Sequence, residues 1–337
     1  MDSLTHVLTG AVIGEATLGK KIGSKAMIWG SIISSMPDFD VFISPFLNPV
    51  DALFFHRGIT HSIFFIAIIS PVLAWLLKKT DKNNSTTLKD WLNLVLFALL
   101  FHIGIDCFNT YGTGILEPFS RIRVSYDSMS IIDIIIITLS FLFIVAIVLF
   151  RKENKIRRVL AWSNISFVVL YVILSIFLKM HIENTVNEQL KIKEIKYQRL
   201  LTTPLPLTSL MWRIIVEDSS GYYTSNISIL DNKRDLDFRY VARNDDNIKS
   251  IIKTKEISGL IKFTKGFYIT DSIATNRVNM YDLRFGGLDF NVPDSYVFTF
   301  QILKKNNGFE VSRSHPQRKI NLKTTGQYFK RVFSRKE

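Results

Sequence analysis

Two uninterrupted apolar runs constrain the fold of this chain more than any other feature. Residues 131–150 contain one acidic residue, Asp133, near their start, and residues 159–178 contain no charged residue. A helix of about 20 residues is long enough to cross the roughly 30 Å hydrocarbon core of a bilayer. Each run therefore predicts a membrane-spanning helix. The chain has 337 residues, which leaves room for a second domain.

Four further segments complete a predicted bundle of about six membrane helices. Residues 63–77 and 91–105 are apolar enough to be spans. Residues 4–18 and 26–36 are short and contain glycine, so we expect half-spans or tilted helices packed inside the bundle. Small residues let helix backbones approach closely. The residues concerned are Gly10, Gly14 and Gly30.

The loops between these segments alternate in charge. The first, third and fifth loops are rich in lysine and arginine, and the intervening loops, 37–62 and 107–130, hold fewer basic residues. The positive-inside rule places the basic loops on the cytoplasmic side. The intervening loops and the region after residue 178 then fall on the non-cytoplasmic side. The basic residues are Lys20, Lys21, Lys25, Lys78, Lys79, Lys82, Lys89, Arg151, Lys152, Lys155, Arg157 and Arg158.

The second half of the chain is more polar than the first and has no long apolar run. We expect a helical stalk and linker over 181–203, a β-rich extramembrane domain over 204–312 and a loose basic tail over 313–337. Short runs of β-branched and aromatic residues between turn signals are typical of antiparallel strands, and one predicted strand covers 260–269.

The formal net charge is +13, and its surplus lies mostly in the second half. Basic residues beside a bilayer meet anionic lipid headgroups, so we expect membrane lipid as a partner and no nucleic acid. The sequence leaves a protein partner open. The single cysteine, Cys107, excludes an intrachain disulfide and a CxxC zinc motif. The first residues lack the basic start of a signal peptide, so we expect mature protein from residue 1 onward.

Histidines and aspartates gather in the first third of the chain. Imidazole and carboxylate are ligands of zinc and manganese, and ionisable groups near a membrane default to functional hypotheses. In the predicted topology all of them fall on the non-cytoplasmic face. Their number exceeds the three or four protein ligands of one zinc ion, so we expect one or two divalent ions, with zinc favoured over manganese. The predicted ligands are His6, Asp38, Asp40, His56, His61, His102 and Asp106.

The aspartates occur in two patterns that suit a shared ion. His102 and Asp106 are four residues apart in a helical segment, so both lie on one helix face. Asp38 and Asp40 follow Pro37 directly after an apolar run, which places two carboxylates near one point. A buried His–Asp hydrogen bond would explain the first pair equally well, and an exposed loop would explain the second.

The segment between residues 56 and 62 combines several functional signals. His56 and His61 flank Arg57 just before an apolar helix, which either Thr60 or Ser62 can cap. Arginine forms bidentate hydrogen bonds with phosphate or carboxylate, so Arg57 is predicted to hold an anionic group of the substrate. An interfacial loop with histidine and arginine at the membrane surface is the alternative interpretation.

These motifs, in this order, resemble those of the YdjM-like family. Its members are described as inner-membrane, metal-dependent hydrolases of bacteria and archaea, and the resemblance covers roughly residues 1–180. It implies that the seven predicted ligands are metal-site positions and that the chain resides in an inner (cytoplasmic) membrane. The motifs are Met1-Asp2-Ser3-Leu4-Thr5-His6, Pro37-Asp38-Phe39-Asp40, His56-Arg57-Gly58-Ile59-Thr60-His61-Ser62 and His102-x-x-x-Asp106.

Three functions are compatible with these features. The first is a membrane hydrolase that cleaves a phosphoester or lipid-linked substrate with metal-activated water; we assign catalytic roles to Asp38, Arg57 and His61. The second is a structural or binding protein in which the ion ties helix ends together. The third is an ion transporter, which is disfavoured because the polar residues do not form a chain across the bilayer, although Glu15 would extend such a path.

Overall fold

The computed structural model describes residues 1–81, 84–231, 235–286, 296–305, 308–314 and 322–334. The chain divides into two compact units. The N-terminal unit comprises Met1–Phe46 and Phe55–Leu174, and the C-terminal unit comprises Leu47–Phe54 and Ser175–Glu337. A short stretch from the first part of the chain thus belongs to the C-terminal unit.

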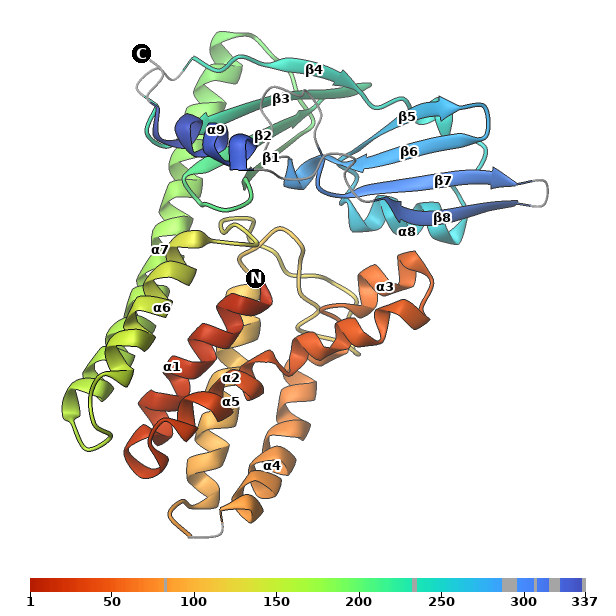
Figure 1. Ribbon diagram of the computed structural model, residues 1–337. Coiled ribbons are helices and arrows are strands. Elements are labelled where there is room, and N and C mark those ends of the chain that lie inside the picture. Colours follow the sequence, from red (N-terminus) through yellow and green to blue (C-terminus); the bar gives the residue numbers. More distant parts are fainter. Residues whose placement is uncertain (82–83, 232–234, 287–295, 306–307, 315–321, 335–337) are drawn as a thin grey trace. The chain divides into compact units, whose positions relative to one another are not determined.

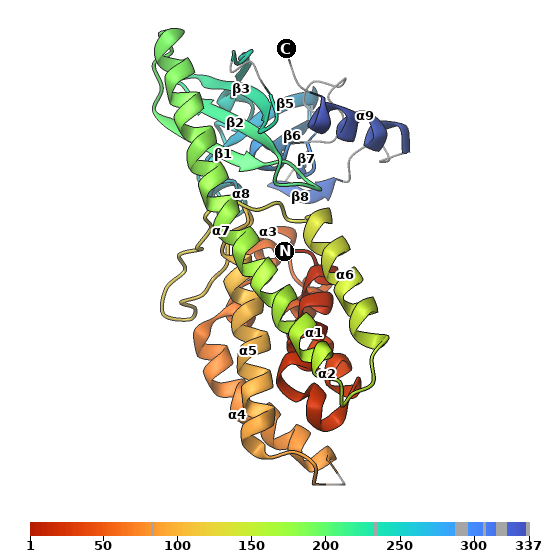
Figure 2. The same ribbon diagram turned by 90° about the vertical axis from the view of Figure 1, so that its left-hand side faces the viewer.

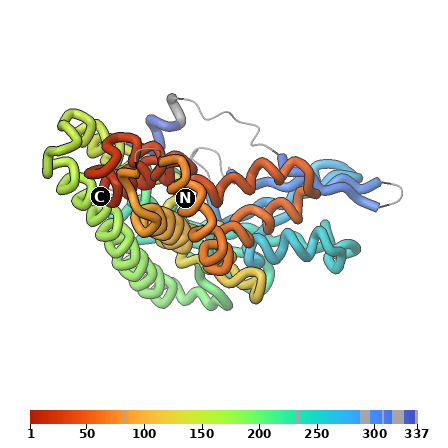
Figure 3. Tube along the Cα trace, turned by 90° about the horizontal axis from the view of Figure 1, so that it is seen from below, coloured from red at the N-terminus to blue at the C-terminus, as the bar shows by residue number. Residues whose placement is uncertain are grey.

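The N-terminal unit is a helical bundle in which α5 contacts α1, α2 and α4. Figure 3 views α5 roughly along its axis. Short 3-10 helices lie between α2 and α4. The elements are α1 (Ser3–Ile22), α2 (Lys25–Ser35), η1 (Pro37–Phe42), η2 (Ser44–Phe46), η3 (Ile59–His61), α4 (Ile63–Thr80), α5 (Leu88–Asp106), α6 (Ile134–Val148) and the first part of α7 (Lys155–Ile192).

Among the described residues, three helices are long and apolar enough to cross a membrane, namely α4, α5 and α7, and α6 is a shorter apolar helix. Large side chains on their outer faces, such as Ile68, Leu142 and Leu170, are more than half exposed. Contiguous exposed apolar surface of this kind suits lipid contact. The membrane helices are therefore confirmed, whereas the predicted number of about six is not established by helix length.

Capping residues set where α4 and α5 begin. Ser62 caps the start of α4, because its hydroxyl accepts a hydrogen bond from the Phe65 N–H. It is one of the two residues predicted as the cap. Thr87 and Asp90 form a reciprocal capping box at the start of α5. The span and the stalk predicted as separate helices are one continuous helix, α7. Figure 2 shows that helix along its length.

Glycine allows α1 and α2 to pack with their backbones nearly in contact. A Cβ atom added to Gly14 would lie 2.0 Å from the Ala26 carbonyl oxygen, and one added to Gly30 would lie 2.0 Å from the Gly10 carbonyl oxygen. The close approach predicted for these glycines is confirmed. It holds the start of α1 against the segment that leads into η1.

Replacement of Gly14 by alanine is expected to destabilise the bundle by about 1–3 kcal/mol, because the added methyl group overpacks the α1–α2 contact. Gly104 is the matched control, since a Cβ there meets nothing within 4 Å. Gly104→Ala should be neutral or stabilising by up to about 1 kcal/mol, the helix propensity difference. Thermal unfolding of both variants in detergent measures the contrast; equal stabilities would contradict the packing.

The C-terminal unit contains two four-stranded antiparallel sheets, each a meander in chain order. Figure 1 labels their strands. The first sheet comprises β1 (Arg199–Pro204), β2 (Met211–Glu217), β3 (Gly221–Ser228) and β4 (Arg239–Ala242), and the second comprises β5 (Tyr268–Ala274), β6 (Arg277–Asp282), β7 (Thr299–Lys305) and β8 (Gly308–Ser314). The remaining elements are α3 (Pro49–Phe55), η4 (Asp245–Asn247), α8 (Lys255–Phe263), η5 (Leu283–Phe285) and α9 (Leu322–Phe333).

Alternation along β2 builds a core on both faces of the first sheet. Trp212 and Ile214 pack against Val186 of α7, and Ile215 on the opposite face packs with Phe267 near the second sheet. The first sheet thus has apolar contacts on both faces, one of them with α7.

The inserted helix α3 packs on α8. The rings of Phe54 and Phe263 meet edge to face with centroids 6.3 Å apart. A Cβ added to Gly259 would lie 2.5 Å from Val50 Cγ1, and Lys255 Nζ lies 3.1 Å from Asp51 Oδ2. The segment Leu47–Phe54 thus folds with the C-terminal unit.

The β-rich domain is confirmed, but the strand predicted over 260–269 is wrong. Its first part is α8, in which Ile257, Leu260 and Phe263 are buried at helical spacing, and β5 begins only at Tyr268. The segment predicted as a loose tail holds the end of β8 and helix α9. Residues 315–321 and 335–337 of that segment lie outside the described residues.

Candidate metal centre

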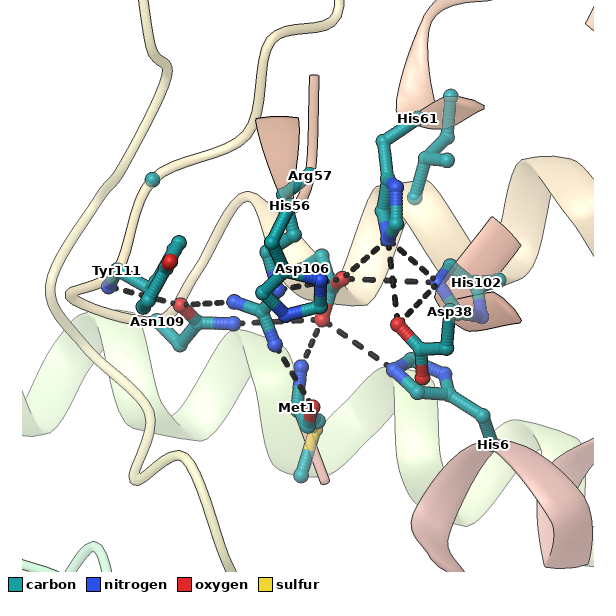
Figure 4. Close-up of polar contacts among 12 residues, drawn as sticks. Met1, His6, Asp38, His56, Arg57, His61, His102, Asp106, Asn109 and Tyr111 are labelled. Atoms are coloured by element: carbon teal, nitrogen blue, oxygen red, sulfur yellow. Dashed lines mark hydrogen bonds and ion pairs between the residues drawn. The ribbon is translucent and has the colours of Figure 1, made fainter. Parts of the chain in front are cut away.

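Separate elements of the N-terminal unit place four predicted ligands around one point. Asp38 lies on η1, which begins at Pro37, and His61 ends η3 directly before α4. His102 and Asp106 lie in the last part of α5, on one face of the helix. Figure 4 shows the side chains turned toward one another.

The distances between ligand atoms of these four residues are short and similar. His61 Nε2 lies 3.1 Å from His102 Nε2, 3.3 Å from Asp38 Oδ1 and 3.6 Å from Asp106 Oδ2. His102 Nε2 lies 3.7 Å from Asp38 Oδ1 and 3.6 Å from Asp106 Oδ2. All four ligand atoms lie within 4.8 Å of one another.

This donor set fits a divalent metal ion. Ligand atoms about 2.0–2.2 Å from a tetrahedral zinc ion are roughly 3.3–3.6 Å apart, which matches the distances above. Among the residues that the structure describes, buried Asp38 Oδ1 and Asp106 Oδ2 have no hydrogen-bond partner. Unpaired buried polar atoms are rare in folded proteins, and a cation between them would satisfy both.

Charge and protonation favour the same conclusion. Burial lowers the pKa of His61 well below its usual value, so its imidazole is neutral and has a lone pair available. Two carboxylates, Asp38 and Asp106, are buried in the cluster, and the cationic groups of Arg57 and of the Met1 N-terminus both lie against Asp106. A divalent cation would also offset the charge of Asp38, which is unfavourable when buried alone.

His6 lies at the edge of the four-residue cluster. Its Nε2 is 3.3 Å from Asp106 Oδ1, and its ring stacks on that of His102 with centroids 3.6 Å apart. Neither ring nitrogen of His6 has a hydrogen-bond partner within the described part of the chain. The structure therefore brings His6 to the site, beside the four-residue cluster.

The other two predicted ligands, Asp40 and His56, form a layer behind His61. His56 Nδ1 lies 2.7 Å from Asp40 Oδ1, and Asp40 Oδ2 accepts from the Arg57 N–H and from the Thr60 hydroxyl. Burial disfavours the Asp40 carboxylate, but the hydrogen bond with His56, the imidazoles of His56 and His61 and the Arg57 N–H together outweigh it, and the pKa of Asp40 is lowered. These two side chains lie outside the cluster of four.

Asp40 and Thr60 orient the imidazole of His61. Because the Thr60 hydroxyl donates to Asp40, its oxygen is free to accept from His61 Nδ1, which lies 3.0 Å away. This relay places the proton of His61 on Nδ1 and leaves the Nε2 lone pair directed into the cluster. Such carboxylate support fixes the tautomer of metal-binding histidines.

Replacement of Asp40 by asparagine is expected to weaken metal binding by about 10–100-fold, the usual effect of removing a carboxylate that supports a ligand. Asp51, a half-exposed aspartate on α3 that pairs with Lys255 outside the site, provides the matched control Asp51→Asn. Isothermal titration of the purified variants with Zn²⁺ measures the affinities. An Asp40→Asn affinity equal to that of the control would exclude the relay.

Arg57 lies behind Asp106. Its two terminal nitrogens donate to Asn109 Oδ1 at 2.8 Å and to the Met1 carbonyl at 2.7 Å, and Nε lies 3.4 Å from Asp106 Oδ2. Its backbone has a φ of +59°, a left-handed conformation that is uncommon for residues other than glycine. The guanidinium is thus aimed at Asp106, and its predicted role in holding an anionic substrate stays a prediction.

Some residues of the site were not identified from the sequence. The Asn109 side chain contacts both Arg57 and Asp106, and the Met1 amino nitrogen contacts Asp106 Oδ1. Asn109 follows Asp106 by three residues at the end of α5, and no motif distinguishes it. Glu15, which we left out of the site, is bound by Arg157 at another position in the bundle.

Comparisons with known proteins agree with these features. The family model described as YdjM inner membrane protein matches residues 1–182. The chain is similar to the uncharacterized protein YfhP of Bacillus subtilis (strain 168), with 28% identity over 279 residues, 75% of this chain and 79% of that protein. It is also similar to the inner membrane protein YbcI of Escherichia coli (strain K12), with 29% identity over 122 residues, 36% of this chain and 69% of that protein. No solved structure matches it.

Proposed function

The chain belongs to the YdjM inner membrane protein family, and from this premise we propose that it is a metal-dependent hydrolase of phosphoesters. The proposal rests on one observation, the buried cluster of Asp38, His61, His102 and Asp106, which could hold a metal ion. The sequence motifs that predicted these residues lie within the matched region.

The donor types favour catalysis over a structural role. Structural zinc sites are mostly built from cysteine, whereas hydrolytic sites use histidine and carboxylate. Cys107 donates its thiol to the Ile103 carbonyl and is not part of the cluster. A divalent ion bound by these donors would supply Lewis acidity and lower the pKa of water toward about 7.

The surrounding residues have distinct tasks in this proposal. Asp38, His61, His102 and Asp106 would hold the ion, and Arg57 would fix the Asp106 carboxylate and add positive charge for an anionic substrate. His6 Nε2, which lies 3.3 Å from Asp106 Oδ1 and has no hydrogen-bond partner among the described residues, would be placed to accept a proton from a water molecule at the ion.

A structural metal site is the second candidate. Four protein ligands at near-tetrahedral distances leave no open position, which is the mark of a structural ion. In that case the ion would tie η1, η3 and α5 together and no substrate would be turned over.

Hydrolysis assays on metal-loaded protein in detergent distinguish the two candidates. Bis-p-nitrophenyl phosphate and a fluorescent phospholipid are suitable probes. We expect chelator-sensitive turnover that falls at least a hundredfold in His61→Ala and persists in His181→Ala, which changes an exposed histidine on α7. Bound metal without turnover of any ester would support the structural role instead.

We also propose that the metal centre faces the non-cytoplasmic side of the membrane. The three basic loops join α1 to α2, α4 to α5 and α6 to α7, and they lie together at the end of the bundle away from Met1 (Figure 1). The positive-inside rule supports this orientation. Labelling of a cysteine placed at Lys20 by a membrane-impermeant maleimide in intact cells would contradict it.

A further inference from the structure

We propose that exposed apolar side chains beside Asp38 bind membrane lipid, and that the phosphate ester of a bilayer lipid reaches the metal centre across them. This inference rests on the proposed function and specifies its substrate class. We call this surface the apolar rim. It consists of Phe39, Val41, Phe42, Ile43 and Phe46.

The apolar rim and the metal ligands share the same short helix. In η1, Asp38 and Asp40 are buried, whereas Phe39 is 48% and Phe42 is 70% exposed. Residues three apart lie on one side of a 3-10 helix, and the rings of Phe39 and Phe42 accordingly lie with centroids 6.0 Å apart. The same short helix therefore carries buried carboxylates and exposed aromatic rings. Clustered exposed apolar side chains of this kind mark an interaction surface.

The apolar rim extends, along the chain, the exposed apolar side chains of α2. It follows directly after α2, on which Ile28 and Ile32 are 61% and 46% exposed. Exposed Phe46 extends it at the other end, on η2. Because exposed apolar side chains run from a helix of the bundle into the rim, lipid is the occupant that this continuity along the chain favours over a second protein.

The edge of the metal centre that meets solvent lies beside the apolar rim. The side chains of His61, His102 and Asp106 have no exposed surface, whereas that of Asp38 is 9% exposed. The Ser3 hydroxyl donates to Asp38 Oδ2 at 3.2 Å, and neighbouring Leu4 is 51% exposed. A lipid whose acyl chains lie against the apolar rim would therefore bring its phosphate to Asp38, between η1 and the start of α1.

Site-directed spin labelling tests the lipid contact without reference to activity. A nitroxide is placed at Phe42→Cys in full-length protein with Cys107→Ser, reconstituted in vesicles of phosphatidylethanolamine and phosphatidylglycerol. Ile273→Cys, a 51% exposed site in the C-terminal unit, is the control. We expect the label at 42 to collide with oxygen rather than with a water-soluble nickel chelate. Preferential collision with the chelate, or shielding from both by a protein partner, would overturn the proposal.

Kinetics test the delivery of substrate. Phe42→Asp should lower hydrolysis of vesicle phospholipid at least tenfold while leaving bis-p-nitrophenyl phosphate turnover unchanged, with Ile273→Asp as control. Equal losses on both substrates would refute delivery across the apolar rim and leave the hydrolase intact. Turnover of neither substrate by metal-loaded wild-type protein would instead refute the proposed function, and with it the lipid as substrate.

Discussion

Replacement of Arg157 by methionine is expected to destabilise the N-terminal unit by about 3–5 kcal/mol, because it strands Glu15 as an unpaired buried charge. Arg157 Nε and Nη2 donate to the two carboxylate oxygens of Glu15 at 2.8 and 2.6 Å. Both residues are 3% exposed. Thermal unfolding in detergent measures the loss.

The neighbouring Arg158→Met is the control for this experiment, since Arg158 is exposed, and its effect should stay within about 0.5 kcal/mol. The double variant Glu15→Leu with Arg157→Leu should recover much of the stability, because apolar replacement of a buried ion pair is often neutral. If Arg157→Met were as stable as Arg158→Met, the buried ion pair would be wrong.

Bound metal is expected to stabilise the same unit strongly. A ligand that binds only the folded state adds about 4 kcal/mol at a concentration one thousand times its Kd. For a unit of this size, this corresponds to a rise of roughly 8–16 °C in melting temperature. The rise occurs because the ligands from η1, η3 and α5 come together only in the folded state, so the ion binds that state alone.

Melting curves of wild-type protein with Zn²⁺ and with chelator measure this stabilisation. His102→Ala should abolish the difference between the two conditions, whereas His181→Ala should preserve it. A His102→Ala protein that still gains the full shift from Zn²⁺ would show that the ion binds elsewhere.

The core of the site could be predicted from the sequence because its geometry is largely local. His102 and Asp106 share a face through the helical repeat alone, and Asp38 and His61 lie next to the ends of predicted helices. These side chains come together once the helix ends on one side of the membrane lie close to one another. The roles of Asp40 and His56 could not be predicted, since only the fold decides which carboxylate faces the ion and which supports His61.

Contacts between distant parts of the chain outside the site could not be predicted from the sequence. Glu15 and Arg157 are 142 residues apart, and no local pattern links them. The packing of α3 on α8 is of the same kind, because a short helix near residue 50 has no periodic signal that assigns it to the C-terminal unit. The prediction of a strand over 260–269 was wrong because a short apolar run fits both the helical and the strand repeat. Burial against the second sheet selected a helix for its first part.

Metal quantification by mass spectrometry on purified protein tests the central claim most directly. The four ligands predict about one divalent ion per chain in the wild type, almost none in His61→Ala and an unchanged content in His181→Ala. A wild-type protein that holds no metal after incubation with Zn²⁺, or a His61→Ala protein that holds as much as the wild type, would contradict a metal centre at these residues.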